Sequence, residues 1–163
     1  MKPASIVLPP HCAQRVEPET AARLVGMGAA SLLAGPLLGF IASRECPGHV
    51  LIETLDRVPQ WAQTGRVIIS GFHSPLEQQV LRSMLRRKGR VVKVLARGMT
   101  GYRPTLDERE PLAASRMLVI TACPPQTRRT TRETALARNR LVQALAPEVC
   151  IPHIASGSPL ATL

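Results

Sequence analysis

Aromatic side chains are scarce: among 163 residues there are two phenylalanines, one tryptophan and one tyrosine. Proteins that bind single-stranded nucleic acid without sequence preference commonly stack its bases on exposed aromatic rings. So few rings exclude an extended stacking surface of that kind. A polyanionic partner is still expected, because 21 lysines and arginines against 11 acidic residues give a formal net charge of +10.

Cysteine and histidine pairs at metal-ligand spacing are missing as well. No C-x-x-C pair occurs, and the four cysteines are scattered at Cys12, Cys46, Cys123 and Cys150. This pattern excludes a zinc ribbon and a disulfide framework. We therefore expect free thiols, a cytoplasmic protein, and neither a metal site nor a cofactor. The absence of a Walker A loop and of G-x-G-x-x-G counts against ATP hydrolysis and dinucleotide redox chemistry.

One long uncharged segment, residues 24–43, has about the length of a membrane span. Several glycines and Pro36 interrupt its apolar residues. We interpret the segment as a short helix and a buried strand, separated at Gly35-Pro36. We therefore expect no membrane partner.

Short apolar runs alternate with helical patterns along most of the chain. This alternation predicts an α/β fold, with a Rossmann-like parallel sheet flanked by helices in three layers. Residues 1–18 contain four prolines and are expected to form an extended N-terminal arm, followed by a single domain over residues 19–163. The expected strands are 37–42, 66–72, 91–95, 117–121 and 149–155; the expected helices are 19–34, 50–65, 75–88 and 130–145, with a loop over 100–111.

Small, polar or cationic residues follow most of the predicted strands. They are Ser43-Arg44, Ser70-Gly71-Phe72-His73-Ser74, Ala96-Arg97-Gly98 and Ser156-Gly157-Ser158. Ser74, Pro75 and Glu77 form a capping-box pattern, which predicts a helix start directly after the second of these strands. The free N–H groups of such a helix start favour an anion. Because the carboxyl ends of parallel strands meet at one edge of a sheet, we expect a phosphate-binding site there.

The order of these motifs resembles the Rossmann-like domain of DNA-processing protein A (DprA/Smf), within the wider group of SLOG nucleotide-binding domains. The resemblance covers roughly residue 37 to the end and is strongest for small stand-alone members. Its most specific parts are Arg138-Asn139-Arg140 and Ser156-Gly157-Ser158. The sequence departs from the family where Phe72-His73-Ser74-Pro75 replaces an Ala-Arg-Gly-Ile-Asp turn.

The resemblance implies a ligand, partners and site residues. Members of that family bind single-stranded DNA, load a recombinase and form dimers, so the implied partners are single-stranded DNA or a nucleotide, a second copy of the chain and a recombinase. The implied site residues are Ser43, Arg44, Ser70, Gly71, Arg138, Asn139, Arg140, Ser156, Gly157 and Ser158; the strand-end pattern adds His73, Ser74 and Arg97. Because Arg138 and Arg140 lie about 200° apart around a helix, we expect only one of them to face the site.

Basic residues are concentrated in the second half of the chain. Residues 81–140 hold 15 of the 21 lysines and arginines, including Arg82, Arg86, Arg87, Lys88 and Arg90 at one helix end. Cations at that end also suit the helix dipole, so a solvated basic face is one interpretation. A nucleic-acid footprint is the other.

Two other functions stay open. One is a nucleotide-metabolite binder or sensor, or an enzyme similar to the SLOG nucleotide N-glycosidases; the other is an interaction subunit whose pocket is vestigial. SLOG phosphoribohydrolases carry a Pro-Gly-Gly-x-Gly-Thr loop followed by a glutamate, and no glutamate follows Ser156-Gly157-Ser158 here. Glu77, four residues after His73, is adequately explained as a helix cap. We therefore predict no catalytic residue.

Overall fold

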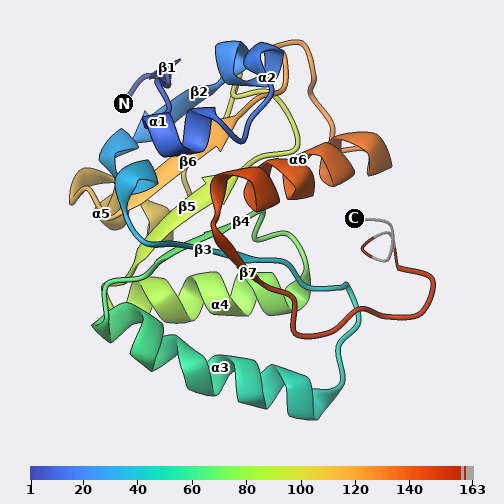
Figure 1. Cartoon of the computed structure of the whole chain (residues 1–163). Coiled ribbons are helices and arrows are strands. Elements are labelled where there is room, and N and C mark those ends of the chain that lie inside the picture. Colours follow the sequence, from blue (N-terminus) through green and yellow to red (C-terminus); the bar gives the residue numbers. More distant parts are fainter. Residues whose placement is uncertain (159, 161–163) are drawn as a thin grey trace.

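In the computed structural model, a seven-stranded sheet lies between two layers of helices, with residues 1–158 and 160 described (Figure 1). The strands are β1 (Ala4–Ser5), β2 (Val25–Gly28), β3 (Leu37–Phe40), β4 (Val67–Ser70), β5 (Arg90–Val94), β6 (Met117–Thr121) and β7 (Glu148–Cys150). Their order across the sheet is β1-β2-β6-β5-β4-β3-β7. Strands β3 to β7 are parallel, while β2 is antiparallel to β6 and β1 to β2. The predicted three-layer, Rossmann-like α/β fold is confirmed.

The central strands are covered on both faces, as their continuous apolar runs predict. Helices α3 (Gly48–Gln63), α4 (Pro75–Arg86) and α5 (Leu106–Ala113) pack on one face. The helix α6 (Arg132–Leu145), the 3-10 helix η1 (Ala30–Ala34) and the short helix α1 (Pro10–Ala13) pack on the other. In β4, Val67, Ile68 and Ile69 are at most 1% exposed. A hydrophobic layer therefore lies on each face of the strands β3 to β6.

The first 18 residues do not stay extended, in contrast to the expected arm. They form β1 and α1, and Pro18 begins the short helix α2 (Pro18–Arg23). Ile6, Cys12 and Val16 are buried in the hydrophobic layer under α6. The physical reason is their apolar character together with Pro10, whose fixed φ suits the first turn of a helix.

The helix expected over residues 19–34 is wrong. Helix α2 ends at Arg23, and Val25–Gly28 forms β2 next to β6. Glycine is a poor helix former, and a Cβ on Gly26 would lie 2.8 Å from Ile6 Cδ1, so a larger residue here would displace the Ile6 side chain. The uncharged segment is therefore divided among β2, η1 and β3. No helix in the described part of the chain has the length and apolarity to cross a membrane.

Two smaller expectations also need correction. The last strand, expected over residues 149–155, is only Glu148–Cys150. The loop expected over 100–111 contains α5, which begins where Glu108 accepts a hydrogen bond from the Thr105 N–H (3.0 Å). Pro111 and the weak amphipathicity of this segment concealed the helix.

A buried ion pair attaches α5 to the sheet. Glu108 is 1% exposed; Lys93 of β5 lies 2.9 Å from its Oε2, and the Tyr102 hydroxyl donates to its Oε1 (2.7 Å). Burial alone would raise the pKa of Glu108, but the hydrogen bonds from Lys93 and Tyr102 outweigh it and lower that pKa below its ordinary value of 4.5.

Glu108→Gln tests this ion pair. A lowered pKa in the folded state gives stability above the ordinary pKa of 4.5, and this stability is lost as the pH falls below it. We expect the variant to be less stable at neutral pH and to lose stability less steeply between about pH 5 and pH 3 than the unchanged protein. Urea unfolding across that range measures both, with exposed Asp107→Asn as the control. Parallel pH curves for Glu108→Gln and the unchanged protein would contradict this account.

Gly28→Ala tests the turn that follows β2. Gly28 has a φ of +108°, and a Cβ there would overlap the backbone carbonyl of Met117. We expect the substitution to reduce the free energy of unfolding by more than about 2 kcal/mol. Gly101→Ala, at φ +74° with no atom within 4 Å of the added Cβ, isolates the backbone strain and should cost about 1 kcal/mol. Equal losses in urea unfolding would show that the Met117 contact has no effect.

Candidate functional site

A basic cavity opens where the strand order reverses. Strands β4, β5 and β6 follow one another on one side of β3. The chain then returns through α6, and β7 pairs with the other side of β3. Ligands of such sheets bind outside the carboxyl ends of the strands at this reversal. The cavity there, called the basic cavity below, has a volume of about 290 Å³. It is lined by Ala42, Ser43, Arg44, His73, Ser74, Glu77, Arg132, Ala135, Leu136, Arg138, Asn139, Ser158 and Leu160.

Arg138 is the buried cation of the basic cavity. Its side chain from α6 crosses the backbone at Gly71, where a Cβ would overlap the guanidinium group. It is 8% exposed, and its Nε donates to Asn139 Oδ1 (3.2 Å). Burial lowers the pKa of Arg138, and the nearby Glu77 partly offsets this. No carboxylate in the described residues forms an ion pair with it. A buried charge without a partner is costly, so this group is suited to an anionic ligand.

Glu77 joins the ends of two strands beneath the basic cavity. Its Oε1 accepts from the N–H groups of His73 (2.9 Å) and Ser74 (3.2 Å), and its Oε2 accepts from the Ala42 N–H (2.9 Å). The N–H groups of His73 and Ser74, just before α4, therefore donate to this carboxylate. We had expected these N–H groups to be free for an anion. Recognition of an anion in the basic cavity then depends on side chains.

Ser74 lies at the wall of the basic cavity and is the N-cap residue of α4. It is 9% exposed, and its hydroxyl oxygen is almost inaccessible to solvent, with no hydrogen bond of ordinary geometry among the described residues. The capping box places this hydroxyl toward the start of the helix rather than in the open cavity.

Ser43 connects β3 to the segment that follows β7. Its Oγ accepts from the Ala155 N–H (2.9 Å) and lies 3.2 Å from the His153 carbonyl oxygen and 3.3 Å from Ser158 Oγ. These contacts hold Ser158 at the wall of the basic cavity.

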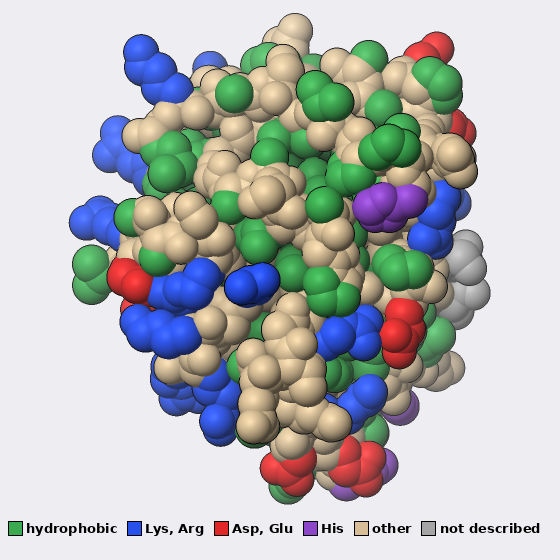
Figure 2. Space-filling model, turned by 60° about the vertical axis from the view of Figure 1, so that its left-hand side comes forward, with side chains coloured by type: hydrophobic (Ala, Val, Ile, Leu, Met, Phe, Trp, Pro, Cys, Tyr) green, Lys and Arg blue, Asp and Glu red, His purple; other side chains and the backbone are tan. Residues whose placement is uncertain are grey.

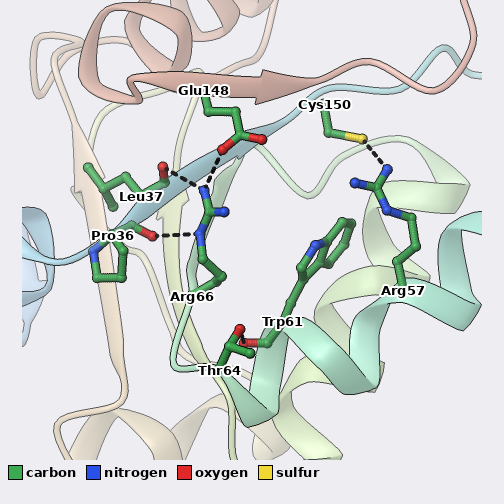
Figure 3. Close-up of polar contacts among 8 residues, drawn as sticks. All are labelled: Pro36, Leu37, Arg57, Trp61, Thr64, Arg66, Glu148 and Cys150. Atoms are coloured by element: carbon green, nitrogen blue, oxygen red, sulfur yellow. Dashed lines mark hydrogen bonds and ion pairs between the residues drawn. The ribbon is translucent and has the colours of Figure 1, made fainter.

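Two arginines fix β7 itself at the edge of the sheet (Figure 3). Arg66 pairs with Glu148 (3.1 Å) and donates to the carbonyl oxygens of Pro36 and Leu37. Arg57 donates to the Cys150 thiol (3.4 Å). A strand of three residues is thereby held in register beside β3.

The structure brings seven of the predicted site residues into the lining of the basic cavity: Ser43, Arg44, His73, Ser74, Arg138, Asn139 and Ser158. Ser70 is the last residue of β4 and Gly71 follows it, both outside the lining; the Ser70 Oγ accepts from the Phe72 N–H (3.0 Å). The ring of His73 makes no hydrogen bond to Glu77 among the contacts of the described residues; the backbone N–H does.

The remaining predicted site residues lie outside the lining of the basic cavity. Arg97 lies over the ring of Tyr102 (5.8 Å to the centroid). Arg140 is exposed near Arg15 on another face of α6, while Arg138 faces the cavity. Ser156 and Gly157 are exposed in a turn, where Gly157 has a φ of +75°.

Sequence reasoning missed two features of the basic cavity. Glu77 was interpreted as a helix cap alone. The face of α6 that lines the cavity includes Arg132, Ala135, Leu136 and Asn139, whose spacing of three, four and seven residues marks one side of a helix. That spacing was visible in the sequence and would have added Arg132 to the candidates.

The basic cluster at residues 82–90 lies away from this cavity. It occupies the carboxyl end of α4, a helix of 12 residues whose amino end forms the cavity wall. The two ends of such a helix are separated by about 18 Å. Figure 2 shows many lysine and arginine side chains gathered at the left of its view. The basic cluster at residues 82–90 and the basic cavity are therefore separate features.

The fold and the cavity at the strand reversal define the class of protein as a Rossmann-like α/β domain. Residues 9–158 match the family model of DNA recombination-mediator protein A, and the chain belongs to this family. A comparison with curated proteins gave no match.

Two solved structures share this fold. DNA processing protein A (DprA) from Streptococcus pneumoniae is 21% identical with a TM-score of 0.69, covering 92% of this chain and 53% of that one. DNA processing protein A from Helicobacter pylori, described for its unique single-stranded DNA binding mode, is 20% identical with a TM-score of 0.72, covering 93% of this chain and 69% of that one. The chain thus spans about half the length of the S. pneumoniae protein.

Glu77→Gln tests the carboxylate beneath the basic cavity. An amide keeps one acceptor but places its NH2 group against backbone donors, so we expect the free energy of unfolding to fall by about 2–3 kcal/mol. Glu53→Gln, an exposed glutamate on α3, is the matched control and should change stability by less than about 0.5 kcal/mol. Urea unfolding distinguishes the two. A Glu77 variant as stable as the control would show that its three N–H contacts are dispensable.

Proposed function

We propose that this protein binds single-stranded DNA, with a backbone phosphate held in the basic cavity, in DNA processing or recombination. The observation that carries the proposal is the buried guanidinium of Arg138, which has no carboxylate partner among the described residues. Arg44 and Arg132 add charge to the same cavity. Guanidinium groups are donors that phosphate oxygens prefer.

Family membership supports DNA as the ligand, and the net charge of +10 supports a polymer with many phosphates. The H. pylori protein, which shares the fold, binds single-stranded DNA. We propose no catalytic step, because Glu77 is committed to three backbone N–H groups. On family membership we also propose that the protein acts as a homodimer and delivers DNA to a recombinase in the cytoplasm.

Arg138→Ala and Arg44→Ala test this function by titration of a fluorescent single-stranded oligonucleotide at two salt concentrations. We expect an affinity loss of at least about tenfold for Arg138, and a smaller loss for exposed Arg44. Each contact removed should also reduce the salt slope by about 0.7. Circular dichroism checks that the variants stay folded.

Arg140→Ala is the matched control for these variants. It removes the same charge from the same helix outside the basic cavity, and its affinity should change by less than about threefold. Equal losses for Arg138 and Arg140 would contradict the assignment of the cavity. If a mononucleotide binds while DNA does not bind even at low salt, the nucleotide-binder alternative replaces DNA binding.

A further inference from the structure

The basic cluster at residues 82–90 has no part in the basic cavity, and little of its charge is balanced. All five of its cations are exposed: Arg82, Arg86, Arg87, Lys88 and Arg90. Among the ion pairs of the described residues, only Lys88 of this cluster takes part, with Glu110 (3.4 Å). Closely spaced exposed cations attract polyanions in particular, because each phosphate that they neutralise releases a small counterion.

The dipole of α4 accounts for only part of this cluster. Cations are favoured in the last turn of a helix, and the effect falls off beyond that turn. Arg86 is the last residue of α4, and Arg87 and Lys88 follow it directly. Arg82 lies about one turn earlier, and Arg90 is the first residue of β5. The helix dipole therefore leaves these last two cations without an explanation.

A line of polar side chains connects the basic cluster to the basic cavity. Gln78, Arg82 and Arg86 follow at intervals of four residues, so they lie along one side of α4. The Gln78 amide donates to the backbone carbonyl of His73 (2.8 Å), and His73 lines the basic cavity. Arg82 in turn donates to the Gln78 side chain (3.5 Å), and it shares a small cavity of about 250 Å³ with Arg86. These contacts form a continuous path from the cavity wall to the cluster.

Within the described part of the chain, α4 differs from its neighbours in having no exposed carboxylate. Its one acidic residue, Glu77, is buried and accepts from backbone N–H groups. Helix α3, by contrast, exposes Glu53 and Asp56. Asp107 of α5 lines the cavity shared by the two arginines, but it forms no ion pair with either of them. A chain of phosphates along α4 therefore meets amide and guanidinium donors over the length of the helix.

We propose that the DNA strand whose phosphate lies in the basic cavity continues along this side of α4, where Arg82 and Arg86 bind its further phosphates. The inference rests on the proposed function, because it takes the basic cavity as the first contact. The 12 residues of α4 span about 18 Å, which corresponds to about five nucleotides at the spacing of about 3.4 Å along one strand of a duplex. A trinucleotide held in the basic cavity is therefore too short to reach Arg86.

The length of the oligonucleotide provides the test. Fluorescent oligothymidylates of about three to twelve nucleotides are titrated into the full chain at about 50 mM salt. We expect the affinity of the unchanged protein to rise steeply once the strand exceeds about five nucleotides. The double variant Arg82→Gln/Arg86→Gln should bind the dodecamer at least about tenfold more weakly, with a salt slope lower by about 1.4. Its affinity for the trinucleotide should change by less than about twofold, because the basic cavity is intact.

Lys2→Gln/Arg140→Gln is the matched control, since it removes two exposed charges away from α4 and the basic cavity. Its affinity for either oligomer should change by less than about threefold. A dodecamer affinity of the Arg82/Arg86 variant equal to that of the control would overturn the proposal while leaving the proposed function intact. Equal losses for the trinucleotide and the dodecamer would also overturn it.

Two further outcomes distinguish the proposals. If the unchanged protein binds no oligomer of any length, the proposed function fails together with this inference. If poly-L-glutamate displaces the dodecamer as well as unlabelled oligothymidylate does at equal charge concentration, the cluster is a surface for an acidic protein, and the path for DNA along α4 is wrong. Circular dichroism checks that both double variants stay folded.

Discussion

The carboxylate of Glu77 holds together the two strand ends from which the site is built. It is buried, and its two oxygens accept from three backbone N–H groups, one after β3 and two in the turn before α4. A carboxylate is well suited to this position, because charge-assisted hydrogen bonds are stronger than neutral ones. The alignment of Ser43 with Ser74, on opposite sides of this carboxylate, depends on it.

The negative charge of Glu77 and the positive charge of Arg138 have different roles in this site. The negative charge of Glu77 occupies the N–H groups of His73 and Ser74 that would otherwise attract an anion, and the positive charge of Arg138 replaces them. Gly71 leaves the space that the Arg138 guanidinium occupies, because a Cβ there would overlap it in this position. The proposed anion recognition therefore depends on a side chain of α6, a helix packed on β3 and β4, rather than on the backbone.

The five parallel strands, and which polar residues follow them, could be predicted from the sequence because their signals are local. Buried β-branched runs such as Val67–Ile69 and the capping pattern of Ser74 and Glu77 need no knowledge of the rest of the chain. Helix α5 was missed because Pro111 and its weak amphipathicity concealed it, and because the ion pair that attaches it to the sheet joins Lys93 and Glu108, which are 15 residues apart. The antiparallel β2 was missed because Gly26 is explained only by the position of Ile6.

Among the site residues too, some positions follow from local geometry and others depend on distant parts of the chain. The position of Arg138 inside and Arg140 outside follows from helical geometry, although the sequence did not determine which of them faces inward. The exposure of Ser156 and Gly157 could not be predicted, because it depends on where Ser43 holds the segment after β7.

The contacts of Ser43 have a thermodynamic consequence. Its hydroxyl already accepts from the Ala155 N–H and lies within hydrogen-bond distance of His153 and Ser158. An anion that accepts a hydrogen bond from the hydroxyl of Ser43 or Ser158 would compete with these contacts. It would thereby change the free energy with which residues 153–158 are docked on β3. By linkage, the docking of this segment changes the affinity for that anion by the same factor. Binding of such an anion in the basic cavity and docking of residues 153–158 on β3 would then be coupled equilibria.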